Sequence, residues 1–316
     1  MKQDRLAQCI GDVDGKYVQE AEQYKKKSRS SFIKWGAAAA CLCLLLVVAA
    51  ARAIVPNAPA ALDEVPNAGH ALLVPAIELP EDGDEEIQMS MIALIVYKGH
   101  VYTQTSWYDG EEGERVERLV AERLGYAKGG INEWSKQGDY AVEFASTVVG
   151  DVYALEGYSP AFRICIKGYD EDENGNKTPN VQFFENLNGI GITTGRDLFG
   201  DRLGMLEKWE YIEYQEHSNW DNGAPDYVFH RLQSVSGEEI DAFMEALYAG
   251  EFEYVYESDP DFYFNSRQTH LFIHMDDDTV VELRLFEGGY VGYQHMGWYF
   301  VKMPGEAFDL LFEACS

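Results

Sequence analysis

The feature that most constrains this chain is an uncharged apolar run near its N-terminus, from Trp35 to Ala51, which reads WGAAAACLCLLLVVAAA. A helix that spans a bilayer needs about 20 mostly apolar residues, with a range of about 17–25. The run continues to Val55 across one charged residue, Arg52, whose long side chain can reach the membrane surface. We therefore predict a transmembrane helix over residues 35–55 that acts as an uncleaved signal anchor.

Two other interpretations of this run stay open, a cleaved signal peptide and a buried helix of a soluble protein. Signal peptides usually span about 15–30 residues in total, whereas 34 residues already precede the apolar run. Length and flanking residues favour the anchor.

The charge distribution predicts the orientation of that anchor. Residues 1–34 hold eight Lys or Arg and five Asp or Glu, whereas residues 56–316 hold 16 and 49 in a chain of net charge −29. Basic residues flank the cytoplasmic end of a membrane helix. We expect a cytoplasmic tail over 1–34 and an extracytoplasmic remainder, with the chain anchored in the cell membrane. The acidic excess argues against a nucleic-acid partner, because phosphate binding needs a basic face.

Outside the membrane, composition divides the chain again. Residues 56–86 contain five of the ten prolines and are predicted to form an extended, semi-rigid stalk. Residues 87–316 show short apolar segments separated by turn residues, which indicates an α+β domain of mostly antiparallel strands with about three helices. Two subdomains that divide near residue 200 are an open alternative. The expected strands are 91–97, 101–105, 152–155, 162–167, 181–185, 211–214, 228–232, 252–256, 271–275, 280–286, 290–294 and 298–302.

The three helices are predicted from apolar spacing and end signals. The first covers 114–124 with Gly125 as its terminator. The second begins at a capping box formed by Ser236 and Glu239. The third has Pro304 in its first turn, and its expected buried side consists of Phe308, Leu311 and Phe312.

The sharpest local motif is the stretch from residue 170 to 176, which matches the first half of an EF-hand calcium loop. Position twelve of that loop would be Val181, where a bidentate Glu is expected. The alternative is an acidic hairpin turn closed by Asn-Gly. No other cofactor is expected, and a weak calcium site would use Asp170, Asp172, Asn174 and Asn176.

Other candidate residues allow two interpretations each. His270 and His274 lie four apart on a predicted strand and face one side, as a metal pair or as an ordinary strand pair. Cys165 and Cys315 could form a disulfide or stay separate. A group of aromatic residues could form a stacking surface for a glycan or peptide, or could fill a core: Tyr254, Tyr256, Tyr290, Tyr293 and Trp298.

The N-terminal sequence IGDVDGKYVQEA, a basic stretch and IKWGAAAACLCL together resemble a leader shared by many uncharacterised membrane proteins of Gram-positive bacteria. Some proteins with similar leaders look like anti-sigma regulators, whose short cytoplasmic part binds a sigma factor. The stretches VGDVY, GY and LFEGGYVGY are also similar to ectodomains of that group. The resemblance implies a membrane location and an orientation across the membrane, and it implies no catalysed reaction.

The chain carries no G-x-S-x-G elbow, no P-loop and no dinucleotide-binding glycine pattern. We therefore expect a non-enzymatic, membrane-anchored sensing or interaction module of the bacterial envelope, with an envelope protein, peptide or glycan as ligand. One alternative is an anti-sigma-like regulator with a cytoplasmic partner for residues 1–34. The other is a surface-tethered hydrolase.

Overall fold

The computed structural model describes residues 71–77, 92–132, 134–171, 175–221, 229–256, 258–303 and 305–315. All described residues belong to one compact unit, Val65–Ser316. The predicted cytoplasmic tail and the predicted membrane helix at 35–55 therefore lie outside the described residues. Within the described ranges, no helix has the length and apolar character needed to cross a bilayer.

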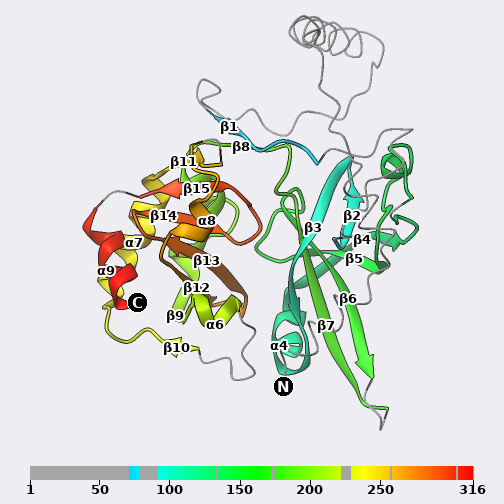
Figure 1. Cartoon of the computed structure of the whole chain (residues 1–316). Coiled ribbons are helices and arrows are strands. Elements are labelled where there is room, and N and C mark those ends of the chain that lie inside the picture. The colour runs from blue at the N-terminus through cyan, green and yellow to red at the C-terminus, as the bar shows by residue number, and fades with distance from the viewer. Residues whose placement is uncertain are drawn as a thin grey trace, which may run out of the picture. The chain divides into compact units, whose positions relative to one another are not determined.

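The described part is α+β, with two large antiparallel sheets and few helices, as expected (Figure 1). The first sheet has six strands in the order β2-β3-β7-β6-β5-β4. Its strands are β2 (Leu94–Tyr97), β3 (His100–Tyr108), β4 (Val120–Lys128), β5 (Val149–Leu155), β6 (Arg163–Glu171) and β7 (Lys177–Glu185).

The strands expected over 91–97 and 101–105 pair as an antiparallel hairpin at the start of this sheet. Tyr97 of β2 pairs with His100 of β3, so Lys98 and Gly99 form a two-residue turn. Both turn residues have positive φ, 49° and 75°. That combination belongs to the tight hairpin turns whose twist matches the twist of the strands.

The helix predicted over 114–124 is wrong in its second half. Helix α4 covers Gly110–Val116 and a 3₁₀ turn covers Glu117–Leu119, after which the chain continues as β4. Val116 and Leu119 are buried as the helical spacing requires. From Val120 onward, pairing with β5 decides the conformation, because ladder hydrogen bonds outweigh a weak local propensity. Gly125 ends no helix, and an added Cβ there would lie 2.2 Å from the Phe144 ring.

The second sheet has seven strands in the order β10-β9-β12-β13-β14-β15-β11. Its strands are β9 (Trp209–Glu216), β10 (His230–Arg231), β11 (Glu251–Tyr254), β12 (Gln268–Met275), β13 (Val280–Phe286), β14 (Tyr290–Tyr293) and β15 (Tyr299–Lys302). Short helices connect or follow these strands, namely α5 (Met205–Lys208), α6 (His217–Asp221), α7 (Gly237–Ala249), α8 (Phe262–Asn265) and α9 (Glu306–Ala314).

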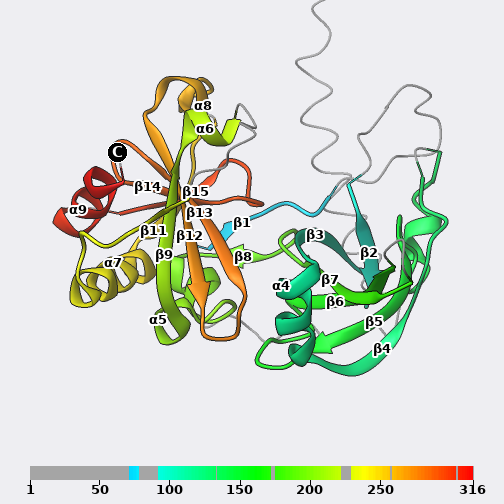
Figure 2. The same cartoon turned by 90° about the horizontal axis from the view of Figure 1, so that it is seen from below.

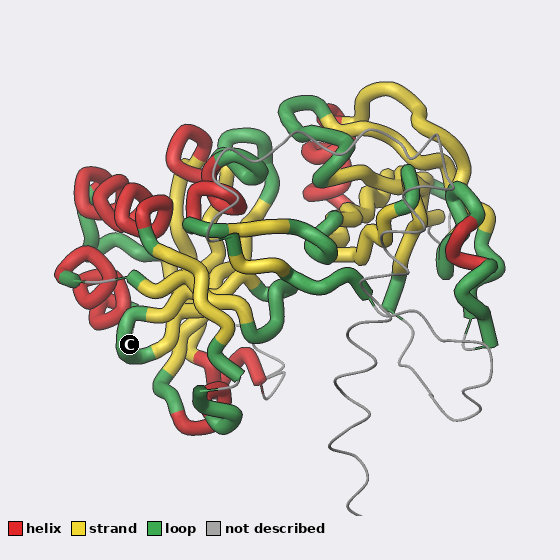
Figure 3. The backbone as a smooth tube through the Cα atoms, turned by 90° about the horizontal axis from the view of Figure 1, so that it is seen from above, coloured by secondary structure: helices red, strands yellow, loops and turns green. Residues whose placement is uncertain are grey.

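The main core lies between the second sheet and helices α7 and α9 (Figure 2). The predicted capping box at the start of α7 is confirmed, because Ser236 Oγ accepts from the Glu239 N–H and the Glu239 carboxylate accepts from the Ser236 N–H. The predicted buried side of α9 is also confirmed. The remaining helical segments, red in Figure 3, are short compared with the yellow strands of the two sheets.

A third, two-stranded ladder joins β1 (Leu72–Leu73) to β8 (Gly191–Ile192). The Val74 N–H donates to the Ile190 carbonyl at 2.9 Å, and the Val74 side chain is buried in the main core with Ile192. Strand β1 of this ladder lies inside the range 56–86 that is predicted as a stalk. It attaches the chain to the segment that connects the two large sheets.

Candidate functional site

The two faces of the second sheet differ in chemistry. Along β12, the side chains of Leu271, Ile273 and Met275 enter the main core. Because side chains alternate along a strand, His270 and His274 lie together on the opposite face, as expected. Residues that are directly opposite each other on paired strands share a face of the sheet. His270 is therefore accompanied on this face by Gln215 of β9 and Arg284 of β13. Phe272 is likewise accompanied by Glu213 of β9 and Glu282 of β13.

A line of hydrogen bonds crosses this face from a carboxylate through two imidazole rings. Glu282 Oε1 lies 2.9 Å from His270 Nδ1, and His270 Nε2 lies 3.1 Å from His217 Nδ1. With both rings neutral, His270 Nδ1–H donates to the carboxylate and His217 Nδ1–H donates to His270 Nε2. The lone pair of His217 Nε2 then faces Arg284 Nη2, 3.5 Å away.

Aromatic rings fix the geometry of this line. The Trp220 ring stacks on His270 with centroids 4.4 Å apart and an interplanar angle of 15°. The Arg284 guanidinium lies 5.6 Å from the Trp220 ring and 5.0 Å from the Tyr263 ring. Arg284 is half-buried, so its cation is held by ring faces at the edge of the protein.

Arg284 and His217 open into a hollow of about 390 Å³, which we call the arginine hollow. This volume lies within the range of about 300–1,000 Å³ that is typical of small-molecule sites. The described lining contains two arginines, one histidine and no carboxylate. Its residues are His217, Tyr263, Phe264, Ser266, Arg267, Gln268 and Arg284.

A second hollow, of about 240 Å³, lies where the first sheet meets the second. Glu282 lines this second hollow and is also hydrogen-bonded to His270. Its carboxylate therefore connects the second hollow to the line of histidines. The lining is of mixed charge and includes Glu112 and His295. The hydroxyl of Thr105, which also lines this hollow, is buried with no hydrogen-bond partner among the described residues.

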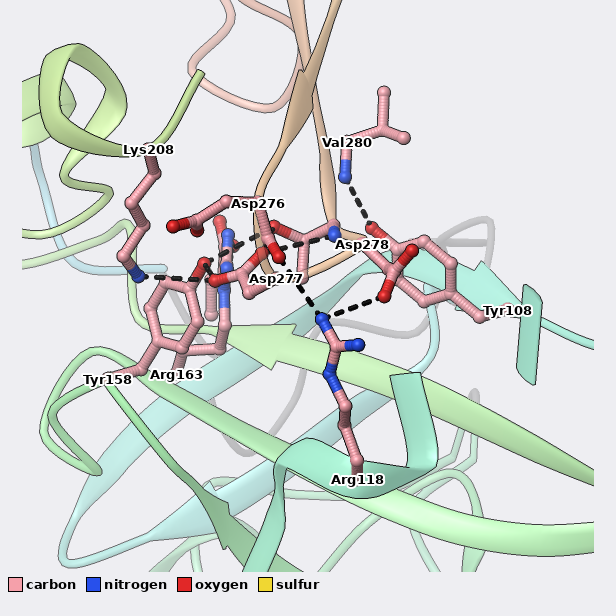
Figure 4. A network of polar contacts seen from close by, with 11 residues as sticks. Tyr108, Arg118, Tyr158, Arg163, Lys208, Asp276, Asp277, Asp278 and Val280 are labelled. Atoms are coloured by element: carbon pink, nitrogen blue, oxygen red, sulfur yellow. Dashed lines mark hydrogen bonds and ion pairs between the residues drawn. The ribbon is translucent and has the colours of Figure 1, made fainter. Parts of the chain in front are cut away.

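Polar contacts join the two sheets beside this second hollow (Figure 4). The Tyr158 hydroxyl donates to Asp277 Oδ2 at 2.7 Å, and Lys208 Nζ lies 3.1 Å from the same oxygen. The Tyr108 hydroxyl accepts from the Val280 N–H at 3.0 Å. These bonds support the β12–β13 turn, so they hold the strands that carry His270 and Glu282.

Burial lowers the pKa of three histidines, because the charged imidazolium is penalised away from water. For His270 and His274 the carboxylates of Glu282 and Glu213 oppose this shift only in part. The pKa of His295 is lowered for the same main reason. All three rings are therefore held in their neutral form near pH 7.

These shifts predict that the folded protein loses stability on acidification at pH values above those at which carboxylates titrate. A folded-state pKa below the unfolded value of about 6.5 means that the unfolded chain binds more protons as the pH falls. The contribution is fully present above about pH 6.5 and is lost as the pH falls toward the lower folded-state values. We expect the urea midpoint to decrease from pH 7 to pH 5. The decrease should be smaller for His270→Gln, whose native side chain is buried; a decrease equal to that of the parent protein would contradict the assignment.

The predicted calcium loop lies partly outside the described residues, which leave out Asp172 and Asn174. Asp170 is on β6 and pairs with Thr178 of β7, and its Oδ1 accepts from Asn180 Nδ2 at 2.8 Å. The flanking strands thus form a hairpin. Among the described residues, no group of three or more His, Cys, Asp or Glu side chains is arranged to hold a metal.

The structure also places the two candidate cysteines and the five candidate aromatic residues. Cys165 and Cys315 are free thiols, each buried in a different cluster, and burial raises the pKa of each to about 12. Of the five aromatic residues, Tyr293 is in the core whereas Tyr254 and Tyr256 are exposed. The five residues are therefore divided between the core and an exposed face.

The sequence did not indicate that five residues belong to this site: His217, Trp220, Arg267, Glu282 and Arg284. One usable signal was present, because Glu282 and Arg284 are the polar positions in the alternating strand VVELRLF. Pairing that strand with 268–275 across the Asp276–Asp278 turn would have brought Arg284 opposite His270. The position of His217 depends on how α6 folds back over β12, which no local pattern indicates.

Comparison of the chain with protein-family models, with curated proteins and with solved structures finds no match.

Proposed function

We propose that the protein is a non-enzymatic, membrane-anchored module of the bacterial envelope that recognises an extracytoplasmic ligand through exposed aromatic side chains of its second sheet. The anchor is the predicted helix at 35–55, and the steep charge difference across it supports the outward orientation of the acidic part. The observation that carries the proposal is the exposure of aromatic rings around β11, α8 and β15.

We call these rings the aromatic surface. Phe264 is 85% exposed, Tyr256 48% and Tyr254 37%. Ring contacts connect most of the group, with centroids 5.0 Å apart for Tyr256 and Trp298 and 4.4 Å apart for Tyr263 and Trp298. The surface consists of Tyr254, Tyr256, Tyr263, Phe264, Trp298 and Tyr299.

A rigid support makes this surface suitable for recognition. Beneath it, Phe262, Phe286 and Phe300 form a separate buried cluster on which Tyr263 and Trp298 pack. Aromatic side chains with few rotatable bonds lose little conformational entropy on binding. Contiguous exposed apolar rings mark interaction sites more often than scattered single ones do, and sugar rings or peptide side chains can lie on their faces.

The test is in-cell crosslinking followed by capture of the full-length chain. We expect envelope partners to be captured by the parent and lost from the double variant Tyr256→Ala/Phe264→Ala. The matched control is Trp134→Ala, which removes an aromatic ring that is 79% exposed and lies outside the aromatic surface. Equal capture by all three chains would refute a recognition role for the aromatic surface, and a cytoplasmic partner that depends on residues 1–34 would support the anti-sigma-like alternative.

A further inference from the structure

We propose that the arginine hollow binds an oxyanion, a carboxylate or phosphate group, on the ligand that the aromatic surface recognises. This inference rests on the proposed function, and it adds the charge and chemical class of the ligand. Residues 56–316 carry 49 acidic and 16 basic side chains, yet the described lining of this hollow has two arginines and no carboxylate. A concave site with that lining selects for negative charge.

Arg284 is placed to make the central contact. Its guanidinium lies 5.0 Å from the Tyr263 ring and 5.2 Å from the Phe286 ring, and such contacts with aromatic rings fix the orientation of a cation. The β13 backbone fixes the origin of the side chain, since β13 is paired on both sides. A planar guanidinium in a fixed orientation suits two parallel hydrogen bonds to a carboxylate or phosphate.

Arg267 supplies a second, adjustable cation. Its Nη2 pairs with Glu313 Oε1 at 2.6 Å, and both side chains are exposed. Exposed ion pairs contribute little, with a median of about 0–1 kcal/mol, so an incoming oxyanion can compete with Glu313 for this arginine. The hydroxyl of Ser266 lies in the same lining and can donate a further hydrogen bond.

The hollow is continuous with the aromatic surface. Tyr263 and Phe264 line the hollow, and the Tyr263 ring contacts Trp298 with centroids 4.4 Å apart. An anion held by Arg284 therefore places the group attached to it on exposed rings. The combination fits a ligand with an acidic group joined to a ring or apolar part, and it disfavours metal cations and basic peptides.

Isothermal titration calorimetry of the full-length chain in a non-ionic detergent tests this inference with three probes. Phenyl phosphate and benzoate carry the two oxyanions on the same ring, and phenol is the uncharged control. We expect at least one of the two anions to bind at least about tenfold more tightly than phenol, and the stronger of them identifies the preferred oxyanion. Equal binding of all three probes, or no binding, overturns the proposal.

Variants locate the site. Arg284→Gln should weaken the preferred anion about tenfold or more, and Arg267→Gln should weaken it by a smaller factor. Arg123→Gln is the matched control, because Arg123 is also exposed and paired with a carboxylate, Asp151, but lies on β4. If Arg284→Gln does not fold, the exposed Arg267 carries the test. Unchanged affinity in Arg267→Gln together with unchanged affinity in any folded Arg284→Gln protein overturns the proposal.

The two proposals can fail separately. If no anion binds while envelope partners are still lost from Tyr256→Ala/Phe264→Ala, the anion site is wrong and the aromatic surface stands. If phenyl phosphate or benzoate binding depends on Arg284 while partner capture is unaffected by the aromatic variants, the anion site stands and the proposed function is wrong.

Discussion

Replacing Glu185 by Ala is expected to destabilise the protein by about 3–5 kcal/mol, the range for removing one partner of a buried ion pair. Glu185 is 0% exposed and Arg163 2% exposed. One carboxylate oxygen accepts from Arg163 Nε at 2.8 Å and from its Nη2, and the other accepts from the Tyr293 hydroxyl at 2.8 Å. The substitution would leave a guanidinium and a hydroxyl buried without that acceptor.

The surroundings of Glu185 also explain why the Tyr293 hydroxyl donates its proton in this hydrogen bond. Burial and the neighbouring Glu185 carboxylate raise the pKa of Tyr293 far above its usual value, so the hydroxyl keeps its proton. Because β7 carries Glu185 and β14 carries Tyr293, this bond joins the first sheet to the second. Its loss should therefore affect both sheets in one transition.

Urea unfolding followed by fluorescence measures the effect of Glu185→Ala. The matched control is Glu171→Ala, which breaks an exposed ion pair with Lys177 at 3.7 Å. An exposed pair of this kind is expected to cost less than about 1 kcal/mol. Similar midpoints for the two variants would show that the buried carboxylate contributes far less than its surroundings indicate.

Gly195→Ala is the second substitution with a large expected effect, about 3 kcal/mol, at the upper end for overpacked cores. An added Cβ would lie 1.9 Å from the Leu247 carbonyl oxygen and 2.9 Å from its carbon. Those are backbone atoms of α7, which cannot rotate away. The Gly195 N–H also donates to the Gly250 carbonyl at 2.9 Å, so the segment is held against α7.

The control for this substitution is Gly138→Ala, where nothing lies within 4 Å of the added Cβ. Its φ of −63° is also accessible to alanine. We expect thermal unfolding of Gly138→Ala to match the parent and that of Gly195→Ala to shift to clearly lower temperature. A parental melting temperature for Gly195→Ala would mean that α7 moves easily on the sheet.

Elements with strong local signals were predicted well. The strand expected over 280–286 has the bounds of β13, because alternating side chains and flanking turns are local properties. The start of α7 was equally predictable, since a capping box needs only residues three apart. Segment 120–124 was not, because the same apolar positions fit a helix stripe and a bulged strand, and pairing with β5 decides between them.

The site was less predictable because its parts come together only through tertiary structure. His270 was a candidate from its spacing to His274, yet its observed partners Glu282 and His217 come from β13 and α6. The π-helical turn Arg196–Gly200 was also missed. It buries Leu198 and Phe199 against α7, and a segment of five residues carries no periodic pattern that could reveal this.

The ladder between β1 and β8 has a mechanical consequence. For a chain held at its N-terminal end, tension enters the described fold at Leu72–Leu73 and loads a ladder of two residue pairs before it reaches either large sheet. So short a ladder should peel first, and extraction of Val74 from the core would follow. Separation of this ladder would therefore lengthen the chain under load before either large sheet opens, and it would release the Tyr299 hydroxyl of the aromatic surface from the Leu73 carbonyl.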